Sequence, residues 1–270
     1  MTIFALLMAC RPYDERPTCD VADKRDVWVM DEIRFSRQAE GVSDGFDLDG
    51  TADPVCGVED RTSPSGQPGI DNSFATLIPA LEQTEAMAVE SLILAAINDG
   101  DLLLMYEFGG LDDRTEDDCV SFEFLRGHGL PLLGTDGYLE ADQTIARDPD
   151  AASYPFAEAA VVDRSIEVGP MLVDLPFHIF ALDLEFGLED ARIRVDLHED
   201  GTSSGVFSGA MDPQQVLDVA ANEDVDAALY GILVALFANT KDLAPDETGA
   251  CTRISVGFQF TTRPAFLYEE

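Results

Sequence analysis

Apolar and polar residues alternate along several stretches of this 270-residue chain, and this period of two limits its folds more than any other feature. In the stretch 119–125 the apolar positions are Val120, Phe122 and Phe124. Near the C-terminus four positions continue the pattern: Ile254, Val256, Phe258 and Phe260. Successive side chains of a strand point to opposite faces, so the pattern indicates strands with one buried face. The sequence therefore predicts a protein built mainly from antiparallel sheet.

The stretch 182–197 alternates on both sides of Glu189 and Asp190. This arrangement predicts a β-hairpin that turns at these two acids and buries one face. The acids of its first strand would then face the arginines of its second strand: Asp183 and Glu185 opposite Arg192 and Arg194.

Helical patterns occur at four places, in chain order 74–83, 84–98, a helix beginning at Asp212 and Pro213, and 225–238. The last of these is apolar on nearly every face, so we expect it to be buried on all sides. Together with the strands, these helices predict a predominantly antiparallel α+β fold, a β-sandwich-like domain with several core-packed helices.

The N-terminus, MTIFALLMAC, carries an apolar stretch too short to span a bilayer. It ends in Leu-Met-Ala-Cys10, which resembles the lipobox of bacterial lipoproteins, whose cysteine is lipidated. We therefore expect a signal segment at 1–10, a polar tether at 11–25 and a single β-rich domain at 26–270. No Lys or Arg precedes the apolar stretch, and a first strand or helix of the fold is the alternative interpretation. The lipid would be the protein's one contact with a membrane.

The remaining four cysteines are an even number, and none lies in a C-x-x-C pair: Cys19, Cys56, Cys119 and Cys251. In an exported protein this count predicts two disulfides. Four cysteines allow three connectivities, and the sequence does not choose among them. Buried reduced thiols are the alternative if the chain is not exported.

Charge excludes one class of partner. The chain has 16 basic and 53 acidic side chains, a net charge of −37. Such a charge repels nucleic-acid backbones, so we expect no nucleic-acid partner.

The segment 42–72 is rich in Gly, Pro, Asp and Ser and is predicted to be one long loop. Within it, Asp47-Leu48-Asp49-Gly50-Thr51 matches the D-x-D-x-T nucleophile motif of haloacid-dehalogenase-like phosphatases. In that family a buried parallel strand precedes the first aspartate, whereas AEGVSDGF precedes it here. We therefore reject the phosphatase interpretation.

Calcium is the interpretation that we favour for this loop, because its side chains offer hard oxygen donors in a glycine-rich segment. The candidate ligands are Asp44, Asp47, Asp49, Asp53, Asp60, Asp71 and Asn72. An EF-hand is excluded, because Gly50 at its sixth position would put Cys56 where the bidentate glutamate belongs. A solvated acidic loop without an ion remains the alternative.

The surrounding sequence does not support the other catalytic motifs. The stretch 201–205 matches G-x-S-x-G, but all three histidines precede Ser203 and no helix follows directly, so we predict a turn. The chain has three histidines and no H-E-x-x-H motif, so the sequence offers no zinc ligand set. Carboxylate pairs carry no signal, because 53 acids place some pair at a useful distance in any fold.

Three stretches resemble uncharacterised predicted lipoproteins of myxobacteria-like bacteria: GFDLDGTADP with the loop that follows it, AAINDGDLLLMYEFGGLDD and CTRISVGFQF. The resemblance implies an exported cell-envelope protein and no particular activity. We expect a non-enzymatic domain that binds a ligand, a glycan or a cell-surface protein and is stabilised by disulfides and calcium. A secreted hydrolase that acts through carboxylates is the alternative.

Overall fold

The structure is a computed structural model and describes residues 24–81, 89–179, 182–222 and 227–268. Ten of the described strands form a large sheet: β1 (Arg25–Phe35), β6 (Leu103–Gly109), β7 (Asp117–His128), β8 (Gln143–Arg147), β9 (Tyr154–Val161), β10 (Ser165–Ile179), β11 (Leu182–Leu197), β12 (Ser203–Met211), β13 (Leu243–Pro245) and β14 (Cys251–Tyr268). A small sheet contains β2 (Gln38–Ala39), β3 (Val42–Ser43), β4 (Arg61–Thr62) and β5 (Pro68–Ile70). The helices are the 3₁₀ turn η1 (Ser73–Thr76), α1 (Ile78–Leu81), α2 (Val89–Asp99), α3 (Pro213–Asn222) and α4 (Ala227–Ala238).

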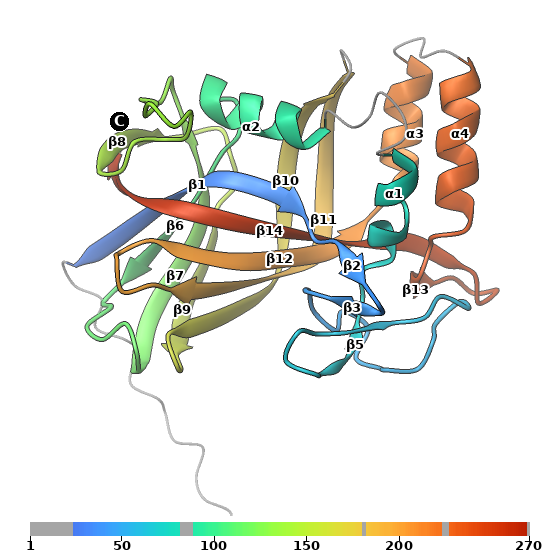
Figure 1. The fold of residues 1–270 in the computed structure, drawn as a ribbon, viewed down its shortest axis with the longest axis horizontal. Coiled ribbons are helices and arrows are strands. Elements are labelled where there is room, and N and C mark those ends of the chain that lie inside the picture. The colour runs from blue at the N-terminus through green and yellow to red at the C-terminus, as the bar shows by residue number, and fades with distance from the viewer. Residues whose placement is uncertain (1–23, 82–88, 180–181, 223–226, 269–270) are drawn as a thin grey trace, which may run out of the picture.

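The large sheet curls back on itself. Its strands follow the order β1-β6-β7-β8-β14-β12-β11-β10, and β1 also pairs with β14. The pairing of β8 with β14 is parallel, whereas the other ladders of this sheet are antiparallel. Figure 1 shows the strands facing one another around a common interior, with α2 across one side and the small sheet below one end. The predicted β-rich, sandwich-like α+β fold is therefore confirmed.

Aromatic side chains fill the interior of the large sheet. Trp28 and Tyr106 are 1% and 0% exposed and stack with 5.6 Å between ring centroids. The Trp28 indole also donates a hydrogen bond to the Gly201 carbonyl at 2.9 Å, so its polar atom is satisfied. Phe207 of β12 stacks on Phe258 of β14 at 4.9 Å. Such pairs contribute about 0.5–1.5 kcal/mol each beyond the burial of their area.

Residues 182–197 form one continuous strand, so the predicted hairpin is wrong. β11 pairs with β10 on one side and with β12 on the other, and both ladders shift register near Asp190. Asp190 has φ of 51°, as the extra residue of a β-bulge can. A bulge moves the alternation by one position, and this imitates a turn in the sequence. Asp183 and Glu185 therefore lie in the same strand as Arg192 and Arg194 and not opposite them across a turn, and Arg194 pairs with Asp44 at 2.8 Å.

The helices differ in how well the sequence predicted them. α2 buries Ile93 and Ile97 against the sheet, as its pattern indicates. The prediction that 225–238 is buried on all sides is wrong, because Ile232 and Val234 of α4 are 47% and 40% exposed. α3 lies beside α4 at one end of the sheet (Figure 1), and Phe237 of α4 is buried in the hydrophobic core. No helix among the described residues is long and apolar enough to cross a membrane.

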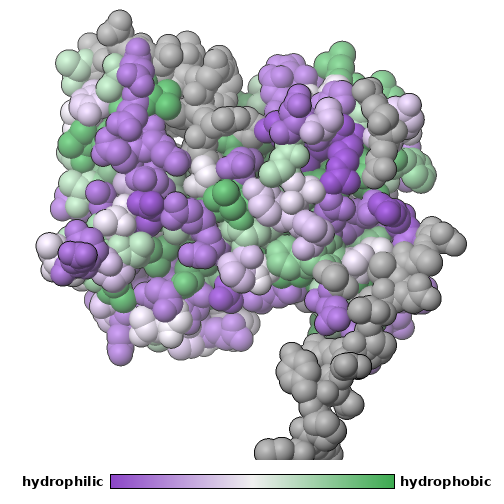
Figure 2. All heavy atoms as spheres, turned by 180° about the vertical axis from the view of Figure 1, so that it is seen from behind, coloured by the Kyte–Doolittle hydropathy of each residue, from purple (hydrophilic) through white to green (hydrophobic). Residues whose placement is uncertain are grey.

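Hydrophilic residues occupy much of the surface seen from behind, with apolar residues in smaller patches between them (Figure 2). This distribution agrees with a composition in which 26% of residues are charged. Exposed large apolar side chains occur on α4 and also at places such as Leu130 and Phe266.

The close packing of strands gives a stability prediction at Gly205 of β12. A Cβ at this position would lie 2.0 Å from the Arg194 carbonyl oxygen and 2.6 Å from the Phe260 ring. We expect Gly205→Ala to lower the free energy of unfolding by about 3 kcal/mol, because backbone must move to make room. Denaturant unfolding measures the change.

Gly231 of α4 is the matched control, because a Cβ built there meets no atom within 4 Å. In an exposed helix alanine is favoured over glycine, so Gly231→Ala should raise the free energy of unfolding by about 0.5–1 kcal/mol. Equal effects of the two substitutions would contradict the packing described for β12.

Candidate functional site

The acidic loop lies beside the small sheet, below the end of the large sheet (Figure 1). Short pairings hold its two ends together: Thr62 N donates to the Gly41 carbonyl at 2.9 Å, and Asp71 N donates to the Phe46 carbonyl at 2.9 Å. The predicted long loop is therefore a chain segment that leaves β3 and returns through β4 and β5. This return brings residues from both ends of the loop to one place.

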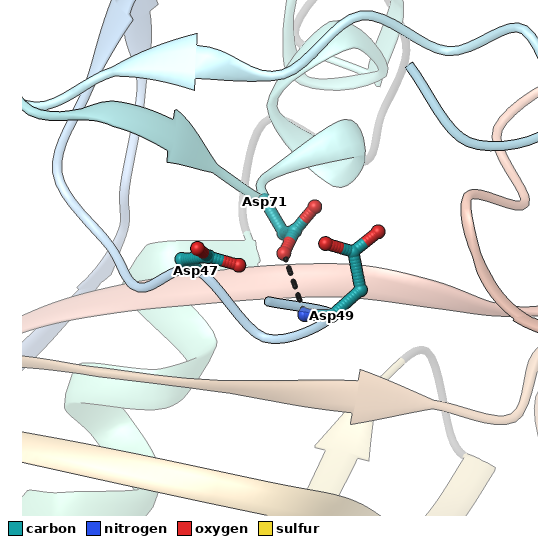
Figure 3. A group of neighbouring side chains, drawn as sticks. All are labelled: Asp47, Asp49 and Asp71. Carbon is teal, nitrogen blue, oxygen red and sulfur yellow. Dashed lines mark hydrogen bonds between the residues drawn. The ribbon is translucent and has the colours of Figure 1, made fainter. Parts of the chain in front are cut away.

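Asp47, Asp49 and Asp71 converge there. One carboxylate oxygen from each lies within 4.8 Å of the others. Figure 3 shows the three side chains pointing toward one another, Asp47 and Asp49 from the loop and Asp71 from just beyond β5. No other group of three or more His, Cys, Asp or Glu ligand atoms this close is found within the described ranges.

Local hydrogen bonds position these carboxylates. Asp71 Oδ2 accepts hydrogen bonds from the backbone N–H groups of Leu48 at 2.6 Å and Asp49 at 3.3 Å, and Figure 3 shows the second of these. Asp47 Oδ1 accepts from Gly50 N at 2.6 Å, where φ of 80° suits glycine. Since the loop backbone supplies donors to its own aspartates, the sequence DLDG determines much of this geometry.

Two further carboxylates act on the cluster electrostatically. Asp60 Oδ2 is buried and has no hydrogen-bond partner, and the charges of Asp47 and Asp49 act on this carboxyl group. Asp242 precedes β13, is 4% exposed, and accepts a hydrogen bond from Ser255 N at 2.8 Å. The sequence does not point to Asp242, because this residue lies far along the chain in a stretch with no metal-binding spacing.

The proximity and burial of these acids shift their titration. Burial is the largest cause that raises the pKa of Asp71, to about 8, and the nearby charges of Asp49, Asp242 and Asp60 raise it further. Burial, followed by the charge of Asp49, raises the pKa of Asp60 to about 6. Burial also raises the pKa of Asp242. Each carboxylate is thus costly to ionise without a cation nearby.

The donor set fits calcium. This ion takes 6–8 oxygen ligands, including carboxylates and backbone carbonyls, and tolerates irregular geometry. Gly69 has φ of 87°, and a Cβ on it would lie 3.2 Å from the Thr51 carbonyl oxygen and 3.3 Å from Asp47 Oδ2. Glycine therefore keeps side-chain atoms away from two oxygens of the candidate site. The unpartnered Asp60 Oδ2 offers another oxygen donor.

The other predicted ligands lie outside the group of three. Asp44 pairs with Arg194 of β11 at 2.8 Å. Asp53 is exposed. Asn72 is 2% exposed, and its amide donates to the Ser36 carbonyl at 2.9 Å and to Ser43 Oγ at 2.8 Å. The amide of Asn72 is thus used to hold β3 against the end of β1.

A disulfide fastens the loop to the large sheet. Cys56, in the middle of the loop, is bonded to Cys251 at the start of β14. Cys119 is disulfide-bonded as well, which agrees with the expected use of cysteine, while Cys10 and Cys19 lie outside the described residues. The sequence left the connectivity open, and the structure pairs the two cysteines that are 195 residues apart.

The rejected catalytic motifs have structural explanations. A two-residue strand and an isolated bridge at Phe46 precede Asp47, not the long parallel strand of the phosphatase family. Ser203 is 1% exposed and hydrogen-bonds to Tyr106 and Thr262 inside the sheet. His198 Nε2 instead contacts Ser204 Oγ at 2.9 Å on an exposed turn.

Comparisons with known proteins return nothing: no family model, no curated protein and no solved structure matches this chain.

The pKa of Asp71 leads to a prediction for the protein in chelator. An unperturbed aspartate loses its proton near pH 3.8, whereas folded Asp71 loses it near pH 8. The folded state therefore binds the extra proton between these values, and the free energy of unfolding should fall as pH rises through this window. In Asp71→Asn the fall should be smaller, and the variant should be at least about 1 kcal/mol more stable than the parent at about pH 8.5.

Denaturant unfolding in chelator at several pH values measures this difference. Asn can still accept the Leu48 hydrogen bond, so the substitution removes chiefly the charge. Asp53→Asn removes one exposed charge from the same loop and should leave the pH dependence of the parent. Parallel curves for the parent and Asp71→Asn would contradict the buried-charge interpretation.

Proposed function

We propose that the chain is an exported bacterial cell-envelope protein, lipid-anchored at Cys10, whose β-rich domain is stabilised by calcium and binds a ligand, a glycan or a partner protein. The observation that carries the calcium proposal is the convergence of Asp47, Asp49 and Asp71 within 4.8 Å. These three carboxylates and the Thr51 carbonyl would hold the ion. Asp60 would add a further oxygen or favourable charge.

The cation would relieve an electrostatic cost that the fold otherwise bears. Asp71 is 2% exposed and close to other acids, so its ionised form is unfavourable in the free protein. A divalent ion reverses the sign of that interaction and favours the ionised carboxylates. The ion would thereby hold the loop against the small sheet, which makes its role structural.

A binding role is better supported than the hydrolase alternative. A raised carboxyl pKa is typical of general acids in active sites. Asp71 has such a pKa, but at 2% exposure it is not accessible to a substrate. Export is supported by the disulfide between Cys56 and Cys251, because disulfides persist in oxidising compartments. The resemblance to predicted lipoproteins agrees with this location and adds no activity.

Calcium should stabilise the folded protein. At about 100 times the dissociation constant, an ion that binds only the folded state adds about 2.7 kcal/mol to the free energy of unfolding. Thermal unfolding with excess calcium and with chelator should then give midpoints several degrees apart. The double variant Asp47→Asn and Asp49→Asn should remove the difference.

Asp112→Asn with Asp113→Asn is the matched control, since both residues are exposed acids in the loop before β7. It should retain the full calcium effect. Superimposed unfolding curves for the parent, with and without calcium, would contradict the site. Phosphatase turnover lost in Asp47→Asn would favour the rejected phosphatase interpretation.

Lipidation is tested separately, because Cys10 lies outside the described residues. Labelled palmitate should be incorporated when the full chain is expressed in a bacterium that processes lipoproteins, and Cys10→Ala should abolish it. Cys19→Ala, which changes a cysteine in the expected tether, should keep the label. Incorporation that persists in Cys10→Ala, or Met1 retained on the mature chain, would refute the anchor.

A further inference from the structure

The central part of the acidic loop has few attachments to the rest of the protein. Between residues 52 and 59 its backbone hydrogen bonds are local, such as Val58 N to the Val55 carbonyl at 3.1 Å and Asp53 N to Thr51 Oγ1 at 3.0 Å. Cys56 is different. It is bonded to Cys251, and its sulfur contacts the Gly249 carbonyl at 3.6 Å. The disulfide is therefore the principal described connection between this segment and the large sheet.

The contact that the disulfide closes brings like charges together. Asp47, Asp49 and Asp60 come from the loop, and Asp242 comes from the chain that leads into β13 beside β14. One carboxylate oxygen each from Asp47, Asp49 and Asp71 lies within 4.8 Å of the others, so the closed loop holds like charges close together. Without a cation, electrostatics thus opposes closure of the loop.

We propose that the Cys56–Cys251 disulfide is a redox-controlled clip whose reduction releases residues 50–60 from the large sheet while the sheet stays folded. Cys56 is exposed, so a reductant can reach this half of the bond. Cys251 is 8% exposed and lies within the sheet, whose core does not depend on the loop. The release needs no cation, and only the calcium arm of the test below rests on the proposed function.

The reaction is thiol–disulfide exchange with a dithiol. A thiolate of the dithiol attacks Sγ of Cys56, the S–S bond breaks, and Cys251 leaves as a thiolate that takes up a proton. The second thiol of the reductant then attacks the mixed disulfide, so the reductant becomes a disulfide and Cys56 becomes a thiol. Two electrons and two protons pass from the dithiol to the protein.

Arg61 begins the two-residue strand β4 and directly follows the released segment, so trypsin should cleave after it once residues 50–60 are free to move and this short strand opens with them. In the closed loop Arg61 is partly exposed and its Nε atom is buried. In chelator, we expect dithiothreitol to speed cleavage after Arg61 by about tenfold or more, because cleavage follows the population of the open loop. The emission of Trp28, the sole tryptophan and 1% exposed, should not change on the same timescale.

Cys56→Ser with Cys251→Ser should show the fast cleavage without reductant, and Cys119→Ser, which removes the other described disulfide bond, should not. Equal cleavage of oxidised and reduced parent protein would overturn the clip, and so would a Trp28 shift that accompanies cleavage, since the sheet would then be unfolding. If the double variant does not fold, the parent with and without dithiothreitol still decides between these outcomes.

Adding calcium to the reduced protein distinguishes the redox clip from the proposed cation site. Calcium should slow cleavage after Arg61 if the carboxylates bind it. Fast cleavage on reduction that calcium does not slow would support the clip and count against the cation site.

Discussion

β14 hydrogen-bonds to β1 along one edge and to β12 along the other, and its first residues also pair with β13. This shared strand lets the large sheet curl back on itself and encloses the aromatic core that includes Phe258 and Phe260. It also places Cys251, Ser255 and Gly257 beside the loop, where they meet Cys56, Asp242 and Ser36. The positions of Cys251 and Asp242 beside the loop therefore depend on the register of a strand that begins about two hundred residues after Asp47.

The site combines interactions of opposite sign. The backbone donors of the loop and the disulfide favour closure, whereas the carboxylates oppose it once they are ionised. Such a site is unlike the exposed acidic surface that a net charge of −37 would explain by itself. Exposed charges are screened by water and salt, but Asp71 and Asp242 are at most 4% exposed and are screened far less. The proposed cation would offset this electrostatic cost, and the disulfide holds the loop closed against it.

The sequence predicted strands well where one face is buried along their whole length. β7 and β14 show the expected alternation, because each faces the core on one side and carries polar residues on the other. It failed at Asp190, since a bulge and a tight turn both shift the alternation by one residue. It failed at α4 for another reason. An apolar sequence indicates that burial of the helix would be favourable. How much of the helix is buried depends on how many neighbouring elements pack against it.

Within the loop, the local chemistry of Asp47, Asp49 and Gly50 follows from the sequence, because each acts on backbone groups a few residues away. The glycines permit the turns, and the aspartates accept hydrogen bonds from the N–H groups that those turns expose. Only the tertiary structure decided that Asp71 joins this pair, that Asp242 lies close enough for its charge to act on Asp71, and that Cys56 bonds to Cys251. These contacts are made between segments whose separation in the chain carries no information about distance in space. Asp71 reaches the pair because the chain returns through β4 and β5, whereas Asp242 and Cys251 reach the loop because the pairing of β14 with its neighbouring strands fixes their positions.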